Sequence, residues 1–489
     1  MKKIVLLLLS FFFLESVWCQ YYRPALASSV VNMPTCMGDG AICRSYGNAK
    51  VLVHHVDLAD RHRHHFALQL SDTNVISELV VTLGGQNDVN DTLYEIRDMR
   101  VLGDTCYFCG RRKVNRGEPV YDNWGHVLDP GVEYKGVLGW FPISDFRSQS
   151  VEVNVYHADF AQDMSRLTVR RKEPGLWPWY DLKVTAIGID AQGRQCVTEM
   201  ITPSSSPLMC GGWGITNYVL VGSNDELFCD VLDTEMGTLL LAVDTSDADG
   251  IDRHRKLVLH NIYREGLSVG NFSTGRRLHF DEEPSGWGWH SNDVTAKMAL
   301  AGEGQVSLAF PSVNIEDGRT GIVHVMLNSE GDFLSGSVVD CSAGASVQDV
   351  AFVRRSGYSG VLLRDNQMYD GAVMLIPTNT IGTAARLNLP YTRLQSVCNY
   401  FDNTFFSAGF NRESSLVKCI SQHPLAVDRT CVNVNNIQQQ RIENVVAEKA
   451  NYNWEGAGPS GDSFVRIGTV LATGRVTECS QPLGTAERL

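Results

Sequence analysis

The chain has 489 residues, a formal net charge of −13 and a hydrophobic content of 44%. This length suits two or three ordinary domains or one large repeat domain. The acidic balance argues against a nucleic-acid partner, because binding to phosphates needs a basic surface.

The first 19 residues predict a secretory signal peptide. Two lysines precede an apolar run of about a dozen residues, which is too short for a comfortable transmembrane helix. Val17 and Cys19 suit the positions before a cleavage site, so we expect a mature chain that starts at Gln20. Attachment of a lipid to Cys19 is the alternative, although Trp18 fits that site poorly. We therefore expect export to the periplasm, the cell surface or the extracellular space.

Short strands dominate the predicted secondary structure. Most apolar runs are β-branched or aromatic and are interrupted by Gly, Asn and Asp, which indicates an all-β fold. The segment 435–452 is the best candidate for a helix, because its apolar residues could share one helical face.

One hairpin pattern recurs along the chain. The string "DMRVLGDTCYFC" (98–109) has an extended segment, a polar turn and a second extended segment, as expected for a β-hairpin. Similar segments are found at 185–196, 218–229, 297–308, 349–360 and 397–408, with a weaker one at 256–269. A third strand is predicted to follow several of them, at 136–144, 320–328, 370–378 and 414–421.

A repeat of about 40–50 residues with several strands is what a β-propeller blade requires. The segments above predict seven blades, within a range of six to eight, and an array of β-sandwiches is the alternative. We expect residues 20–48 to form an N-terminal extension and 49–489 to form one propeller. In this prediction the hairpin at 463–479 closes the ring with a strand at 49–58.

The string "IRDMRVLGDTCYFCG", followed by "GVLGWFPI", resembles a phrase in uncharacterised secreted β-propeller-like proteins of Bacteroidota. The resemblance is confined to about 50 residues and to their weaker repeats. It implies a bacterial exported propeller and identifies no catalytic residue.

Thirteen cysteines are present, and twelve remain after removal of the signal peptide, so disulfides are allowed in an exported chain. Cys36 and Cys43 are the expected local pair. Cys106 and Cys109 have the Cys-x-x-Cys spacing, but on a regular strand they face opposite sides and could not bond. With neither a following helix nor a second ligand pair nearby, buried packing is favoured over a redox or zinc site.

Two segments are candidates for cation binding. His62 and His64 would share one face of a strand and could hold a metal, although adjacent arginines favour an exposed polar strand and loop. Asp247 and Asp249 resemble a calcium loop that lacks its distal Glu, and a simple blade turn explains them equally. No other cofactor is expected.

Aromatic residues gather in Gly- and Pro-rich segments, where they could form platforms for sugar rings or anchors for a protein. The candidates are Trp177, Trp179, Tyr180, Trp213, Trp287 and Trp289. Filling of the spaces between blades is the alternative interpretation.

The sequence thus favours an exported, non-catalytic and monomeric propeller that binds a glycan or an extracellular protein through loops on one face. A carbohydrate-active hydrolase or lyase with its site at the axis is the first alternative, by analogy of fold alone. A structural protein that assembles at a surface is the second.

Overall fold

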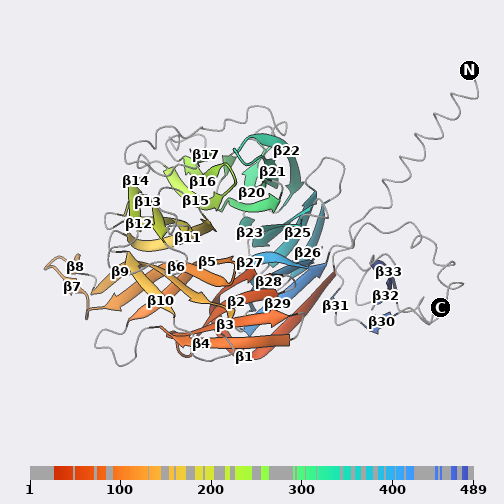
Figure 1. Cartoon of the computed structure of the whole chain (residues 1–489), viewed down its shortest axis with the longest axis horizontal. Coiled ribbons are helices and arrows are strands. Elements are labelled where there is room, and N and C mark those ends of the chain that lie inside the picture. The colour runs from red at the N-terminus through yellow and green to blue at the C-terminus, as the bar shows by residue number, and fades with distance from the viewer. Residues whose placement is uncertain are drawn as a thin grey trace, which may run out of the picture.

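The structure is a computed structural model of the whole chain, shown in Figure 1. The residues that it describes are 27–47, 50–70, 74–83, 92–129, 131–144, 153–158, 161–171, 182–190, 193–202, 215–220, 226–244, 255–263, 290–291, 295–302, 304–314, 317–341, 345–353, 358–364, 371–377, 384–389, 392–401, 404–411, 415–422, 446–449, 452–453, 464–470 and 476–482. The predicted signal peptide lies outside these residues.

The described residues form an all-β structure in which no helix is assigned, as predicted. Five four-stranded antiparallel sheets are arranged in chain order. The first sheet contains β5 (Leu93–Leu102), β6 (Thr105–Asn115), β9 (Val132–Pro142) and β10 (Asn154–Ala158), and the second contains β11 (Ala161–Arg171), β12 (Leu182–Asp190), β13 (Gln195–Thr202) and β14 (Ile215–Leu220). The third contains β15 (Glu226–Asp233), β16 (Gly237–Asp244), β17 (Arg255–Tyr263) and β18 (His290–Ser291), and the fourth contains β19 (Lys297–Gly302), β20 (Gln305–Val313), β21 (Thr320–Leu327) and β22 (Phe333–Asp340). The fifth contains β23 (Ser346–Val353), β24 (Tyr358–Arg364), β25 (Gly371–Pro377) and β26 (Ala385–Leu389).

A sixth, eight-stranded sheet joins the two ends of this series. It contains β1 (Ala27–Ser45), β2 (Lys50–Asp57), β3 (Arg63–Leu70), β4 (Asn74–Thr82), β27 (Thr392–Phe401), β28 (Thr404–Asn411), β29 (Ser415–Gln422) and β31 (Tyr452–Asn453). The first part of β1 pairs with β29, and its last part pairs with β2. This sheet therefore consists of two four-stranded halves that share one long strand.

The first strand of each four-stranded unit lies innermost. The strands β1, β5, β11, β15, β19, β23 and β27 contact one another in a closed cycle. The fold is therefore a β-propeller with six hydrogen-bonded sheets, a number within the predicted range of six to eight. Because the eight-stranded sheet supplies two inner strands, the axis is surrounded by seven of them. Figure 1 shows the sheets grouped around this centre.

Most of the predicted hairpins are present. Segments 98–109, 297–308, 349–360 and 397–408 each form the first two strands of a blade. Segment 185–196 is also a hairpin, but of the second and third strands. Segment 218–229 was wrongly predicted, because it joins the last strand of one sheet to the first strand of the next.

The closing strand comes from a different part of the chain than expected. Residues 27–45, which the sequence analysis assigned wholly to the N-terminal extension (20–48), form β1 and join the two ends of the ring. The C-terminal hairpin exists as β32 (Phe464–Val470) and β33 (Val476–Pro482), but it pairs with β30 (Val446–Lys449) in a separate small sheet. The helix predicted over 435–452 is wrong in its described part, because β30 and β31 are strands.

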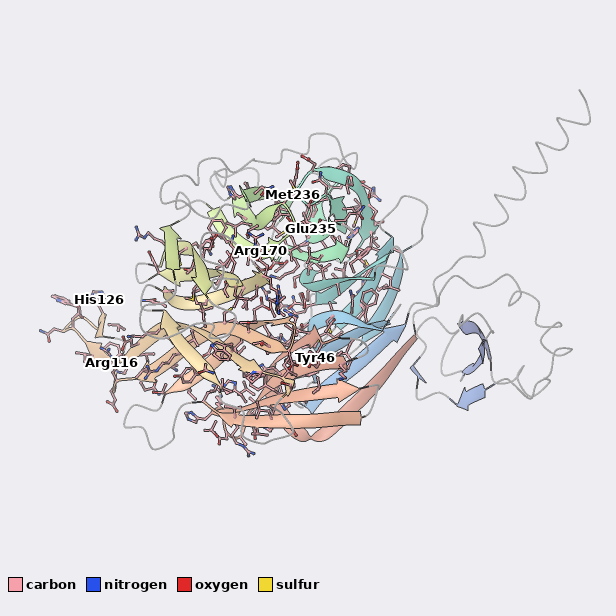
Figure 2. The ribbon with its side chains drawn as sticks, in the orientation of Figure 1. Tyr46, Arg116, His126, Arg170, Glu235 and Met236 are labelled. Carbon is pink, nitrogen blue, oxygen red and sulfur yellow. The ribbon has the colours of Figure 1, made fainter. Side chains whose placement is uncertain are left out.

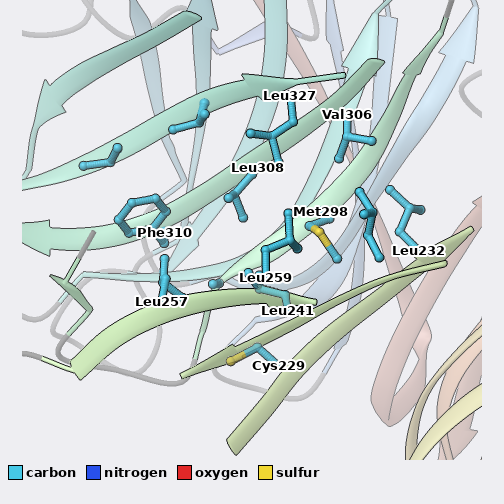
Figure 3. Close-up of a cluster of buried hydrophobic side chains, with 14 of the residues drawn as sticks. Cys229, Leu232, Leu241, Leu257, Leu259, Met298, Val306, Leu308, Phe310 and Leu327 are labelled. Atoms are coloured by element: carbon cyan, nitrogen blue, oxygen red, sulfur yellow. The ribbon is translucent and has the colours of Figure 1, made fainter. Parts of the chain in front are cut away.

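The hydrophobic core lies between adjacent blades. Figure 3 shows one such layer, formed by the blades that contain β15–β18 and β19–β22, with Leu241, Leu259, Leu308 and Phe310 among its residues. Each layer removes apolar side chains from water, at roughly 25 cal/mol per Å² of buried area. Neighbouring blades therefore depend on one another for stability.

The Cys-x-x-Cys pair lies in β6 and belongs to this core. Cys106 packs in the cluster facing the preceding blade, and Cys109 packs in the cluster facing the following one. Both are free thiols without exposed surface, and burial raises the pKa of each. The expectation of buried packing is confirmed. The expected Cys36–Cys43 disulfide is wrong, because Cys43 is a free buried thiol on the continuous strand β1.

Candidate functional site

Bulges in the inner strands turn polar residues toward the axis. In five inner strands, one residue is left out of the pairing with the second strand of the blade, and the residue after it is polar. Such a β-bulge changes the direction of the side chain that follows it. These five residues are Asp98, Arg166, Asp230, Asp349 and Ser396. Arg44 of β1 and Lys297 of β19 complete the series. In the order of the blades, this axial ring is Arg44, Asp98, Arg166, Asp230, Lys297, Asp349 and Ser396, so that cations and carboxylates alternate.

Each carboxylate of the axial ring binds its own blade to the next. One oxygen accepts a hydrogen bond from the following backbone N–H, and the other accepts one from a backbone N–H of the next inner strand. The donors are Met99 and Leu167 for Asp98, Val231 and Met298 for Asp230, and Val350 and Val397 for Asp349, at 2.8–3.2 Å. The ring thereby ties three pairs of blades together.

Arg44 closes one half of the axial ring with direct ion pairs. Its Nη2 lies 2.6 Å from Oδ1 of Asp98, and its Nη1 lies 3.3 Å from Oδ2 of Asp349. Nη1 also donates to Oγ of Ser396 at 2.8 Å, and Nε donates to the carbonyl oxygen of Met99 at 2.7 Å. In this half, every charged group has a partner.

The charges in this half are strongly stabilised. Burial by itself would raise the pKa of Asp98, but Arg100, Arg44 and Arg166 outweigh that effect and lower the pKa to about 2. Burial would likewise lower the pKa of Arg44, yet Asp98 and Asp349 raise it above the ordinary value. Asp98 therefore stays ionised at neutral pH, so it cannot donate a proton to a leaving group as a glycosidase acid does.

The side chains in the other half of the axial ring form fewer direct contacts with one another. The Nζ of Lys297 donates to the backbone carbonyl of Cys229 at 3.3 Å. Within the part of the chain that the structure describes, no carboxylate lies within ion-pair distance of the Arg166 guanidinium. Asp230 faces both cations electrostatically, but its oxygens bind backbone N–H groups.

A serine and histidine cluster between two blades resembles a nucleophilic site in composition only. His324 Nε2 lies 2.9 Å from the hydroxyls of Ser307 and Ser359, and these hydroxyls lie 2.8 Å apart. All three side chains are buried, and burial lowers the pKa of His324 to about 3. Since a substrate cannot reach them, these residues connect two blades and do not form a catalytic dyad.

The two histidines that the sequence offered as metal ligands lie inside the fold. His62 and His64 are both buried and not on an exposed loop, and His64 Nδ1 lies 3.1 Å from Nε2 of His54. Among the described residues, no three His, Cys, Asp or Glu side chains form a group that could hold a metal ion. Asp247 and Asp249 lie outside the described residues.

The predicted aromatic residues also lie outside the described residues, but the strands that flank them are described. In an antiparallel blade, the connection between strands one and two and that between strands three and four leave from the same face. Segment 172–181 joins β11 to β12, 203–214 joins β13 to β14, and 264–289 joins β17 to β18. The described strand ends that flank all three segments therefore lie on one face, which we call the loop face. The segments carry Trp177, Trp179, Tyr180, Trp213, Trp287 and Trp289.

Side-chain contacts between blades support this assignment. Thr234, in the turn between β15 and β16, donates through Oγ1 to the carbonyl oxygen of Ser329 at 2.7 Å. Ser329 lies in the turn between β21 and β22. Asn261, near the end of β17, donates to the carbonyl oxygen of Glu330 at 2.8 Å. First-to-second and third-to-fourth connections of neighbouring blades thus meet on the loop face.

Exposed apolar side chains accompany these turns. Met236 is 46% exposed, Leu300 is 53% exposed and Leu334 is 48% exposed. Met236 lies in the turn between β15 and β16, Leu300 near the end of β19, and Leu334 near the start of β22. Figure 2 labels Met236 beside Glu235 at this part of the molecule. The loop face therefore presents apolar side chains on two adjacent blades.

One exposed aromatic region was not predicted. The hairpin of β7 (Val120–Tyr121) and β8 (Val127–Asp129) protrudes from the blade that contains β6 and β9, and Figures 1 and 2 show it far from Met236. Trp124 at its tip is 86% exposed. Asp122 holds the turn by accepting the backbone N–H groups of Trp124 and His126 at 2.8 and 2.7 Å. The hairpin connects a second to a third strand, so it lies on the face opposite the loop face.

No family model matches the chain, and no curated protein matches it. Among solved structures, it is similar to a prolyl endopeptidase, with 10% identity and a TM-score of 0.39 over 79% of this chain and 46% of that one. The chain thus spans about half the length of that protein. It is also similar to the Dos1 propeller, with 8% identity and a TM-score of 0.39 over 83% of this chain and 95% of that one. Likenesses at this level concern the overall fold alone.

No helix in the described part of the chain is long and apolar enough to cross a membrane.

Proposed function

We propose that this chain is an exported, non-catalytic β-propeller that binds a glycan or an extracellular protein through its loop face. The observation that carries the proposal is the strand order, in which the strand ends flanking the three aromatic-rich segments lie on one face of two adjacent blades. Tryptophan and tyrosine outside a core provide flat apolar surfaces for sugar rings and anchors for protein partners.

The described part of the loop face supports the same proposal. Met236, Leu300 and Leu334 are each about half exposed there. Scattered exposed apolar residues are normal on a soluble protein, but several at one place mark an interaction site. These three residues lie on the same face as the strand ends that flank the tryptophan segments.

The enzyme alternative is less well supported by the axial ring. A hydrolase site at the axis would need an acid and a base or nucleophile with free oxygens. The axis does hold three carboxylates, Asp98, Asp230 and Asp349, but their oxygens bind backbone N–H groups and cations. These carboxylates stabilise the assembly of blades, which is a structural role.

A glycan array and a panel of extracellular proteins, probed with the purified mature chain, test the proposal. We expect binding that Trp287→Ala, Trp289→Ala and Met236→Asp each weaken at least about tenfold, the loss of an interaction hot spot. Trp124→Ala is the matched control, because it removes an exposed tryptophan on the opposite face and should leave binding unchanged. The absence of binding to either class, or equal losses in the control and loop-face variants, would contradict the proposal.

A further inference from the structure

A cavity of about 220 Å³ lies between the half of the eight-stranded sheet that contains β2 and the blade that starts with β5. Its lining residues come from β1, from the end of β2 and the connection to β3, and from the start of β5. The connection between a second and a third strand lies opposite the loop face, as does the start of a first strand. The cavity is therefore separate from the proposed loop-face site.

Apolar side chains form part of the cavity wall. Val56, Leu58 and Leu93 are half-buried, and Ile96 is buried. Tyr94, also half-buried, adds an aromatic residue to this wall. Half-buried apolar side chains still contact water, so a ligand that covers them with C–H groups gains the free energy of burial.

Charged side chains form the rest of the wall. Asp57, Arg61, Glu95 and Arg97 contribute two negative and two positive charges, so the wall carries no net charge. Arg61 and Arg97 are exposed, and the cavity therefore opens to water on their side. Within the part of the chain that the structure describes, no carboxylate lies within ion-pair distance of Arg61, so its N–H donors can bind a ligand.

Glu95 is held in place before a ligand binds. Its Oε2 lies 3.0 Å from Nη2 of Arg97 and accepts a hydrogen bond from Nε of Arg111 at 2.9 Å. Nη2 of Arg97 also lies 3.6 Å from Oδ2 of Asp163 on the next blade. Side chains that are fixed in this way lose less conformational entropy when a ligand binds.

The charge, the donors and the volume of the cavity define its ligand. Because the four charges cancel, the wall attracts neither an anion nor a cation over a neutral molecule. Guanidinium groups only donate hydrogen bonds and carboxylates only accept them, so a ligand with several hydroxyl groups can use both. Pockets for drug-sized ligands have roughly 300–1,000 Å³, and this smaller volume limits the ligand to about one ring.

We propose that this cavity binds a single neutral hexose residue. Hydroxyl groups of the sugar donate to Asp57 and accept from Arg61, and C–H groups of the ring cover Leu58 and Leu93. This site is additional to the loop face, and it uses none of the residues that the loop-face proposal uses.

The first test is titration of the purified mature chain with methyl glucoside, methyl galactoside and methyl mannoside, followed by calorimetry and by saturation-transfer NMR. We expect saturable binding of at least one of them, with a Kd of about 1 mM for so small a ligand. Alanine, a zwitterion of similar polarity, should not bind. Saturable binding of alanine without binding of any hexoside, or no saturable binding at all, would overturn the proposal.

Variants assign the binding to the cavity. We expect Arg61→Ala to raise the Kd of the bound hexoside about tenfold, the loss of hydrogen bonds to a charged group. Leu58→Asp should weaken binding as well, because it removes part of the apolar wall. Arg319→Ala is the matched control and should leave the Kd unchanged, since it removes an exposed arginine from another connection on the same face, between β20 and β21.

Melting temperatures of the variants show whether each one is folded. Arg61 is exposed, so Arg61→Ala should melt as the wild type does and should keep the test valid if Leu58→Asp is unstable. An unchanged Kd in folded Arg61→Ala, or an equal loss in Arg319→Ala, would show that the hexoside binds elsewhere and would overturn the proposal. That result would leave the loop-face proposal standing, because the loop-face variants test it separately.

Discussion

The backbone N–H of Leu167 donates a hydrogen bond to Oδ2 of Asp98 across 3.2 Å, although the two residues are 69 positions apart. The same carboxylate pairs with Arg44, which lies on the strand that joins the two ends of the ring. Asp98 therefore links three blades through one side chain.

Asp98→Asn should destabilise the propeller strongly. The amide keeps the shape but removes the charge that balances Arg44, and an uncompensated buried charge costs about 3–5 kcal/mol. The free energy of unfolding in urea measures this loss. Asp340→Asn is the control, because the Asp340 side chain is 68% exposed and its replacement should change stability by less than about 0.5 kcal/mol. Similar values for the two variants would show that the axial ring does not stabilise the fold.

The sequence predicted the repeat but not the axial ring. The hairpins that start at 297, 349 and 397 were recognised because their first two strands are joined by short connections. Segment 218–229 has the same local pattern, yet its strands belong to different sheets. A strand–turn–strand segment has the same sequence pattern whether or not its two strands pair with each other. Only contacts with residues distant in the sequence distinguish the two cases.

The residues at the axis were missed for a related reason. A charged residue in a strand normally indicates an exposed face, and only the bulges reverse its direction here. One signal was present: Asp98, Asp230 and Asp349 are each followed by Met or Val in the first strand of a blade. The Trp124 hairpin was overlooked because its tip lies in a polar segment without periodicity.

Cys106 and Cys109 should resist thiol reagents in the native protein. Burial raises the pKa of both thiols, and the thiolate is the reactive form. Labelling with N-ethylmaleimide followed by peptide mass spectrometry should leave both unmodified until the protein is denatured. Cys341, which is only partly buried, provides an internal comparison and should react first. Rapid native labelling of Cys109 would contradict its position in the core between blades.

Gly139 in β9 should not tolerate a side chain. A Cβ atom at this position would lie 2.1 Å from the ring of Phe108, and the ring is held by a packed core. Gly139→Ala should therefore cost about 1–3 kcal/mol, as overpacking does. Gly336→Ala is a milder control, because its Cβ would lie 3.2 Å from the side chain of Phe333, which is only partly buried. Thermal and urea unfolding of the two variants should rank them in this order.

His324 should make the protein sensitive to mild acid. Burial lowers its pKa to about 3, whereas an unfolded histidine titrates near 6.5. Because the unfolded state takes up the proton first, the titration of this histidine does not reduce the free energy of unfolding above about pH 6.5. The free energy of unfolding then decreases as the pH falls from 6.5 toward 3, by up to about 1.4 kcal/mol per pH unit for one histidine. His64, whose pKa burial lowers to about 4, adds to the loss in the same range.

The variant His324→Gln separates this effect from the other titrations. Glutamine cannot take up the proton, so the free energy of unfolding should fall less steeply between pH 7 and pH 5 than in the wild type. At pH 7 the variant should be less stable, because the hydrogen bonds to Ser307 and Ser359 are altered. His126→Gln is the control, since its side chain is 80% exposed and it should keep the slope of the wild type. An unchanged slope in His324→Gln would show that His324 is not held neutral by burial between the blades.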